Sequence, residues 1–146
     1  MLAKLFRAIL SPPREHVLLI RLLPLAAASA LSLDRVSLPR LVELAKDPAL
    51  APRFAAEGLG VDEDRLPCIA DRASWLVKRN QRCLVRSLLL FGMLSRLGRA
   101  PVLRLGVARD GDRLLSHAWV MLDGHPVGEE RGVLDSFKPI VSLGSA

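Results

Sequence analysis

The chain has 146 residues, of which 51% are apolar, 25% charged and 4% aromatic, and its formal net charge is +6. This length suits one domain, and the apolar fraction is too high for intrinsic disorder. Two cysteines are too few for a disulfide-stapled secreted scaffold. The sequence contains no zinc-ligand spacing and no glycine-rich phosphate-binding loop, so no metal or nucleotide cofactor is indicated.

The first third of the chain is predicted to be helical. Leu2–Leu10 fits a short amphipathic helix that ends at the following pair of prolines. Val17–Leu33 is the most apolar run, and we expect a helix that is bent or broken near Pro24. A signal peptide or a membrane-surface segment would also be apolar, but Glu15 precedes the run and an arginine lies within it. We therefore expect a buried helix and no stable membrane insertion.

Further helices and turns follow. Pro39–Lys46 has a proline in its first turn, and Ser37 is a candidate N-cap. Asp47–Gly60 is rich in proline and glycine, which predicts a loop or a short helix. Asp62–Asp64 predicts an acidic turn, and Pro67–Arg79 predicts a helix with its apolar residues on one side.

Leu84–Leu97 has a strong helical pattern and follows a break at Asn80–Arg82. Its apolar positions nearly encircle the helix, so we expect it to be buried on most sides. Gly92 within it suggests the close approach of a neighbouring backbone, and Gly98 supplies the C-terminal stop.

After this helix the period of the apolar residues changes from 3.6 to 2, which indicates strands. The third predicted strand contains Pro126 and is expected at a sheet edge. Helices followed by an antiparallel sheet predict an α+β fold, in a single domain over residues 1–146. The predicted segments are Val102–Val107, the hairpin turn Arg109–Asp112, Arg113–Met121, His125–Glu130 and, as a last short strand or extended tail, Val133–Leu143.

The positive charge is concentrated between Arg65 and Arg109, where ten basic residues and one acid occur. Such a segment is either a solvated arginine-rich surface or a face that attracts an acidic partner. Nucleic acid is not expected as that partner, because the segment shows no series of aromatic stacking platforms and no helix-turn-helix or RNA-recognition pattern.

Cys83 is a candidate nucleophile because it lies at the start of the Leu84–Leu97 helix. The free N–H groups at a helix N-terminus favour thiolate over thiol, and Arg82 and Arg86 are expected to add to this effect. The alternative is a small core residue, since free cysteine is often buried. Cys68 is expected to be a core or helix-start residue, and we expect both cysteines to be reduced.

A cysteine nucleophile needs a base, and His117 in the middle of the second predicted strand is the candidate. A single cysteine with a histidine far along the chain is typical of a Cys-His hydrolase, although a lone histidine in a strand is more often structural. His16 and His125 are weaker candidates, because one lies in the N-terminal helical part and the other at the edge of a turn.

The imidazole also needs an acid to hold its orientation. If the hairpin loop is the three residues Leu122–Gly124, His117 pairs with Glu129. If the loop has two residues, His117 faces Glu130 instead, and in either case the carboxylate is within reach. Asp123 is more typical of a turn residue.

Five short blocks of the sequence form a recognisable pattern. They are Cys83-Leu84-Val85-Arg86-Ser87-Leu88, Leu97-Gly98, Leu105-Gly106-Val107, His117-Ala118-Trp119-Val120 and Asp123-Gly124. This pattern resembles the transglutaminase-like leader peptidases of lasso-peptide biosynthesis over about Pro67–Ile140. The first and fourth blocks at this separation are fairly specific together.

The resemblance implies a cysteine protease of papain/transglutaminase-like fold, with a helical part over residues 1–60 and a catalytic core over residues 67–140. The family's catalytic set is Cys-His-Asp, so the implied roles are nucleophile for Cys83, base and acid for His117, and orienting acid for Glu129, where this sequence has Glu in place of Asp. The backbone N–H of Cys83 would form part of an oxyanion hole, with Gln81 as a second donor.

The resemblance also implies partners. The substrate would be a ribosomally made lasso-precursor peptide, whose leader is removed before a separate cyclase closes the macrolactam. Some members carry a fused leader-binding domain, for which this chain is too short, so we expect a separate leader-recognition protein as a partner and the cyclase as a further one. We expect a cytoplasmic protein that uses no cofactor.

Two other functions are consistent with the sequence. One is a transglutaminase-like module that binds a peptide or partner without cleaving it, and the other is a small basic membrane-surface protein that uses Val17–Leu33. Alkylation of Cys83 distinguishes the first from a peptidase, and flotation with anionic liposomes distinguishes the second.

Overall fold

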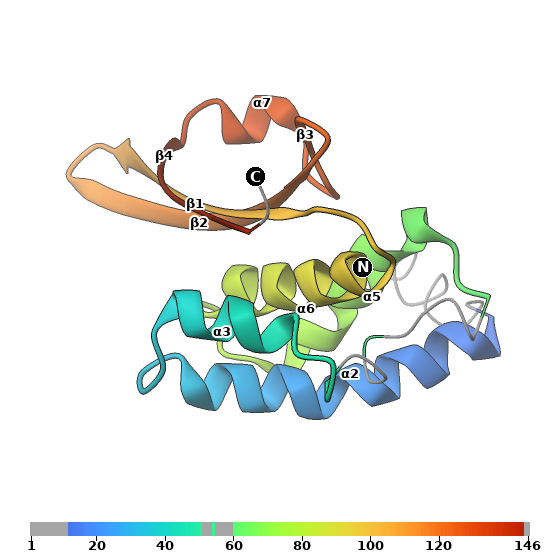
Figure 1. Cartoon of the computed structure of the whole chain (residues 1–146). Helices are drawn as coiled ribbons and strands as arrows, with labels where there is room; N and C mark the ends of the chain where they lie inside the picture. Colours follow the sequence, from blue (N-terminus) through green and yellow to red (C-terminus); the bar gives the residue numbers. More distant parts are fainter. Residues whose placement is uncertain (1–11, 51–53, 55–59, 145–146) are drawn as a thin grey trace, which may run out of the picture.

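The computed structural model describes residues 12–50, 54 and 60–144. Helices come first and a four-stranded sheet follows, so the expected α+β architecture is confirmed (Figure 1). The elements are α2 Pro13–Ser32, α3 Leu38–Ala45, the 3-10 helix η2 Glu63–Arg65, α5 Leu66–Ala73, the 3-10 helix η3 Ser74–Leu76, α6 Arg82–Arg96, β1 Val102–Asp110, β2 Arg113–Leu122, β3 His125–Pro126, α7 Arg131–Leu134 and β4 Lys138–Gly144.

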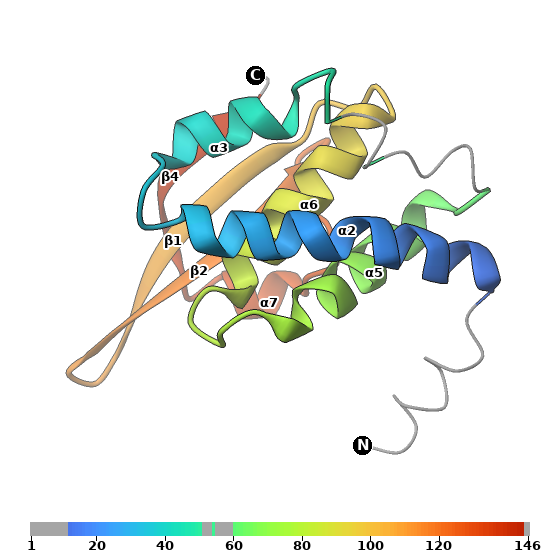
Figure 2. The same cartoon turned by 90° about the horizontal axis from the view of Figure 1, so that it is seen from below.

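α2 is one continuous helix that starts earlier than predicted and runs through Pro24 without a break (Figure 2). Leu18, Leu22 and Ala26 are buried at intervals of four residues, so this face packs against α5 and α6. By length and composition α2 could also cross a membrane, but in this fold it contributes its apolar face to the core. The helix predicted over Leu2–Leu10 lies outside the described residues.

The following helices differ from the prediction mainly at their ends. α3 begins after Ser37 as expected, although the Ser37 side chain makes no capping hydrogen bond. The expected acidic turn is the 3-10 helix η2, and the helix expected over residues 67–79 ends at Ala73 and continues as η3. Part of the loop expected over residues 47–60 lies outside the described residues.

α6 is the central helix of the helical layer, and its residues 87–94 are all buried, as the apolar pattern predicted. Gly98 has a φ of 75° and the N–H of Arg99 bonds back into the last turn, which closes the helix as expected. The close neighbour of Gly92 is the ring of Phe54 and not a backbone: a Cβ there would lie 2.5 Å from Phe54 Cε1.

The sheet has the order β3-β2-β1-β4 and is antiparallel throughout. Asp110 pairs with Arg113, so β1 and β2 extend beyond their predicted ends into a long hairpin. At the next turn Leu122 pairs with His125, which makes the loop two residues long and excludes the three-residue alternative.

β3 has two residues, and the predicted strand to Glu130 is therefore wrong. Pro126 cannot donate to the ladder, and Gly128 adopts a φ of 70°, so the chain turns away from the sheet. The last predicted strand is present as β4 at the other sheet edge, but it begins at Lys138 and not at Val133, where the chain is still in α7.

One face of the sheet packs on the helical layer and the other carries α7 (Figure 1). Leu103 and Val120 pair across β1 and β2 and join the leucines of α6 in one core. Because side chains alternate along a strand, His117 and Trp119 lie on the opposite face from Val120. The site described below therefore lies where the sheet, the N-terminus of α6 and the chain before α7 meet.

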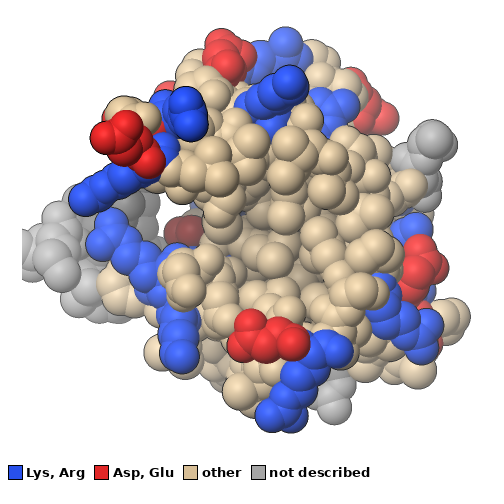
Figure 3. All heavy atoms as spheres, turned by 90° about the vertical axis from the view of Figure 1, so that its left-hand side faces the viewer, with Lys and Arg blue, Asp and Glu red and all other residues tan. Residues whose placement is uncertain are grey.

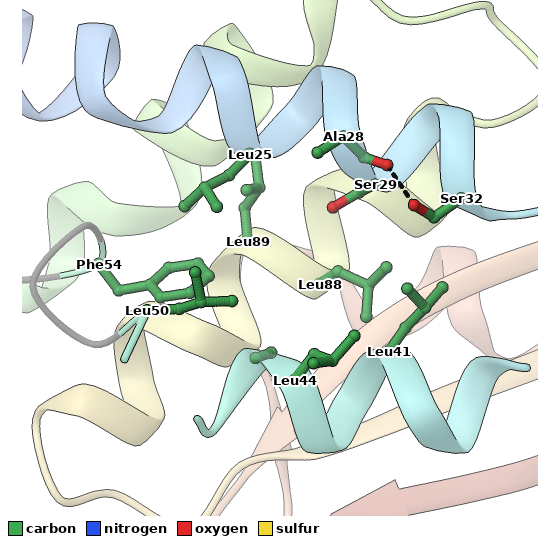
Figure 4. A pocket seen from close by; sticks show the side chains of 11 residues that line it. Leu25, Ala28, Ser29, Ser32, Leu41, Leu44, Leu50, Phe54, Leu88 and Leu89 are labelled. Carbon is green, nitrogen blue, oxygen red and sulfur yellow. Dashed lines mark hydrogen bonds between the residues drawn. The ribbon is translucent and has the colours of Figure 1, made fainter. Parts of the chain in front are cut away.

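An apolar cavity of about 120 Å³ lies within the helical layer, between α2, α3 and α6. Leu25 from α2, Leu44 from α3 and Leu88 from α6 point into it, with Phe54 at one end (Figure 4). This cavity is a gap in helix packing at some distance along α6 from Cys83.

Candidate active site

The N-terminus of α6 lies against an open edge of β2. Because β3 pairs only with Met121 and Leu122, the backbone of Ala118 faces away from β1 with no strand of the described chain beside it. α6 takes the place of that strand: Ser87 Oγ donates to the Ala118 carbonyl at 3.1 Å, and the Ala118 backbone bonds the sulfur of Cys83. Cys83 is thereby held at the second residue of the helix, beside the strand that carries His117.

Cys83, His117 and Glu129 form a continuous chain of contacts. His117 bonds the Cys83 thiol, and its Nε2 donates to Glu129 Oε1 at 3.1 Å. Since an ionised carboxylate only accepts, Nε2 carries a proton and Nδ1 is the nitrogen left for the sulfur. This is the geometry in which an imidazole exchanges a proton with a thiol while a carboxylate fixes its orientation.

The pKa values of the thiol and the imidazole move toward each other. Burial acts to raise the pKa of Cys83, but the bonds with His117, Ala118 and Leu84 outweigh burial and lower it. The bond with Cys83, and after it the bond with Glu129, raises the pKa of His117 to about 9. Both shifts therefore favour a thiolate–imidazolium pair over a neutral thiol–imidazole pair.

Glu129 stays ionised in this environment. Burial acts to raise the pKa of its carboxyl, but the bonds from His117 and Arg86 hold that pKa below its ordinary value. The carboxylate can therefore accept the hydrogen bond from Nε2 at neutral pH.

Two aromatic rings enclose the imidazole. Trp119 stacks on His117 with ring centroids 6.1 Å apart, and Phe137 lies tilted at 5.4 Å. Gly106, which pairs with His117 across the sheet, leaves room for the indole: a Cβ there would lie 2.7 Å from Trp119 Cη2. Alternation along β2 places Trp119 on the same face as His117. Phe137, which lies between α7 and β4 in a segment expected to be extended, was not predicted from the sequence.

Glu129 reaches His117 although the hairpin register that favoured it is wrong. The two-residue loop would place Glu130 opposite His117 in an extended ladder, but the ladder ends at Pro126. Glu130 is instead the exposed residue before α7. Asp123 has a φ of 51° in the turn and accepts a bond from Arg99 at 2.8 Å.

The remaining candidates lie apart from this chain of contacts. His16 bonds the carbonyl of Pro12 in α2, and His125 contacts Arg131 at the sheet edge. Gln81 directly precedes α6 and makes no capping bond with its side chain.

The arginines next to Cys83 act differently from the expectation. Arg86 bonds Glu129 through Nη1 at 2.5 Å, and the guanidinium of Arg82 lies 5.2 Å from the centre of the Trp75 ring. The thiolate is stabilised by His117 and by backbone groups. The role of Arg86 was missed, although its position three residues after Cys83 places both on one side of the helix.

Cys68 is an exposed residue in the first turn of α5, so the core position considered for it is wrong. Both cysteines are free thiols. Among the described residues, no three His, Cys, Asp or Glu side chains are grouped as a metal site requires.

Some members of the arginine-rich segment are paired with acidic side chains. Arg65 bonds Glu15, and Arg99 bonds both Glu63 and Asp123. Figure 3 shows the end of the molecule from which the β1–β2 hairpin projects: its centre is hollowed and uncharged, and side chains of both signs lie around its margin.

A helix N-terminus that presents a cysteine to a histidine on an antiparallel sheet is the arrangement of the papain and transglutaminase class of folds. A family model of the transglutaminase-like superfamily matches residues 19–142, so the chain belongs to this superfamily, which includes cysteine proteases. The match contains most of α2, which the motifs alone did not include. No curated protein and no solved structure matches the chain significantly.

Proposed function

We propose that this protein is a cysteine peptidase that removes the leader from a ribosomally made lasso-precursor peptide. The observation that supports this best is the contact chain from the Cys83 thiol through His117 to Glu129 at the start of a buried helix. The substrate class rests on the five sequence blocks described above and on the superfamily match.

In the proposed reaction the Cys83 thiolate attacks the carbonyl carbon at the leader–core junction. The electrons of the C=O π bond move to oxygen, and the backbone N–H of Cys83, with Gln81 as second donor, stabilises the oxyanion. The C–N bond breaks as His117 gives its proton to the leaving amine. His117 then takes a proton from water, whose oxygen attacks the thioester carbon; the C–S bond breaks and releases the Cys83 thiolate, while Glu129 keeps the ring oriented.

The first prediction concerns the nucleophile. Cys83→Ala should abolish leader release from the precursor peptide, measured by mass spectrometry, and should leave the circular dichroism spectrum unchanged because one small side chain is shortened. Cys68→Ala is the matched control and should retain full activity. Normal processing by Cys83→Ala would overturn the proposal.

Iodoacetamide separates a peptidase from a module that binds without cleaving. Cys68 is more exposed than Cys83. Faster alkylation of Cys83 near neutral pH would therefore reflect its ionisation and not its access. Alkylation of Cys83 no faster than that of Cys68 would favour the binding module.

The proposed partners follow from the same reading. We propose a separate leader-recognition protein, with the macrolactam-forming cyclase as a further partner, in the cytoplasm and without nucleic acid. The packing of Leu18 and Leu22 into the core supports the absence of membrane insertion. Flotation of the protein with anionic liposomes would contradict this part of the proposal.

A further inference from the structure

Arg86 connects α6, which carries Cys83, to the segment that carries Glu129. Its side chain is 12% exposed and extends from α6 to two neighbouring groups. Nη1 lies 2.5 Å from Glu129 Oε1, and Nη2 donates to the carbonyl of Gly128 at 3.0 Å. One planar guanidinium thus holds both the side chain of Glu129 and the backbone that precedes it.

The segment around Glu129 needs such a contact because the sheet does not fix it. The sheet holds this part of the chain only as far as Val127, whose N–H donates to the Val120 carbonyl at 2.9 Å, and residues 128–130 form an irregular connection to α7. Gly128 is wedged between two side chains: a Cβ there would lie 2.5 Å from Pro67 Cβ and 3.0 Å from Arg86 Nη2. The position of the carboxylate therefore depends on α5 and α6, and not on strand pairing.

We propose that Arg86 is a positioning residue of this site, which holds the Glu129 carboxylate against the ring of His117. Arg86 Nη1 and His117 Nε2 bond the same oxygen, Oε1, so the two contacts together set the direction of the carboxylate. The inference rests on the proposed roles of Cys83 and His117. On the side of α5, Asp71 Oδ1 lies 3.9 Å from Arg86 Nε, and Cys68 lines the same depression.

Removing Arg86 should shift the pKa of His117 in opposite directions, depending on whether Arg86 positions Glu129 or acts by its charge alone. If Arg86 acted by charge alone, its removal would leave Glu129 in place with its negative charge no longer offset by the guanidinium. The pKa of His117 would then rise above about 9. If Arg86 positions Glu129, its removal frees the carboxylate and the pKa of His117 falls. The sign of the shift therefore distinguishes the two roles.

The test is an NMR titration of the His117 ring in Arg86→Gln, Arg86→Lys and Glu129→Gln, with the exposed Arg79→Gln as the matched control. We expect Arg86→Gln to lower the pKa of His117 by about one unit or more, and to slow Cys83 alkylation at neutral pH by up to about tenfold. Arg86→Lys keeps the charge but cannot bond two acceptors in a plane, so it should give an intermediate shift. In the background of Glu129→Gln, Arg86→Gln should have no further effect on His117.

A pKa of His117 that rises or stays constant in Arg86→Gln would overturn the inference, as would additive shifts in the double variant. Thermal unfolding shows whether Arg86→Gln folds. If it does not, the titration is made with Arg86→Lys and with the double variant Arg86→Gln/Glu129→Gln, in which both charges of the pair are removed. The peptidase proposal fails by a different result, namely a wild-type Cys83 that alkylates no faster than Cys68.

Discussion

At the scale of single residues, the activity of this site should depend on pH through two opposing ionisations. Cys83 must lose a proton to attack, and its pKa lies below the ordinary value of 9.0 because the bond with His117 and two backbone bonds outweigh burial. His117 must keep a proton for the leaving amine, and its pKa is raised to about 9. Activity is thus expected between these two values.

The pH profile of kcat/KM for leader release measures both limbs. It should rise as Cys83 ionises and fall near pH 9 as His117 loses its proton. Glu129→Gln removes a carboxylate that favours imidazolium, so the alkaline limb should move to lower pH, by about one unit or more. Glu130→Gln is the matched control and should leave the profile unchanged, because Glu130 is exposed before α7. An alkaline limb that stays in place in Glu129→Gln would exclude Glu129 as the partner of His117.

The residues of the site differ in how far the sequence could predict them. Cys83 and His117 follow from helix start and strand position, which are local properties. Strand parity left Glu129 and Glu130 open for the third role, and the family resemblance selected Glu129. In the structure the ladder ends at Pro126, and Glu129 contacts His117 from the irregular segment that follows. Arg86 could not be assigned a partner from sequence, because its contact with Glu129 joins residues 43 positions apart.

At the scale of elements, α6 connects the site to the core. Its first turn presents Cys83, and its remaining length is buried between α2, α3, α5 and the sheet. Periodicity predicted this helix and the β1–β2 hairpin well, because one pattern of burial extends over many residues. It failed for β3 and α7, which are too short for a period to show and are determined by Pro126 and by tertiary contacts.

Two helical glycines give a matched test of packing along these elements. A Cβ on Gly92 of α6 would lie 2.5 Å from the Phe54 ring, whereas a Cβ on Gly132 of α7 meets nothing within 4 Å. Gly92→Ala should therefore lower the free energy of unfolding by about 1–3 kcal/mol through overpacking. Gly132→Ala should change it by less than about 1 kcal/mol, and in the stabilising direction. Urea denaturation of both variants measures the difference, and equal stabilities would mean that Phe54 does not pack on α6.

At the scale of the whole molecule, the helical layer and the sheet share one core. Leu103 and Val120 of the sheet belong to the same buried cluster as the leucines of α2 and α6. The site lies at the edge of β2, where the N-terminus of α6 meets the sheet, so its geometry depends on both layers being folded. The family match over residues 19–142 agrees with this, because it includes the N-terminal helices and the sheet together. Sequence motifs alone located the domain from Pro67 onward. α2 contributes an apolar helical pattern to the sequence, but it contains none of the motifs.

A shared core predicts that the two layers unfold together. Trp119 reports on the sheet because it is 3% exposed, and far-UV circular dichroism reports mainly on the helices. Trp75 is 63% exposed, and Trp75→Phe removes its signal. In this background the urea transitions by fluorescence and by circular dichroism should coincide.

The ion pair of α2 provides a perturbation for this test. Glu15 is buried and accepts bonds from Arg65 Nε at 2.9 Å and Nη2 at 3.2 Å, which join the N-terminal helix to the start of α5. Arg65→Gln should lower the free energy of unfolding by about 1–3 kcal/mol, because a buried carboxylate loses a charged partner. Since α2 and the sheet share one core, the urea transitions followed by fluorescence and by circular dichroism should shift by the same amount, although Arg65 lies far from Trp119 in sequence. The exposed Arg79→Gln should shift neither by more than about 0.5 kcal/mol. A helical transition that moves without the Trp119 transition would show that the helices fold as a unit separate from the sheet, and the site would then form only when the two layers dock.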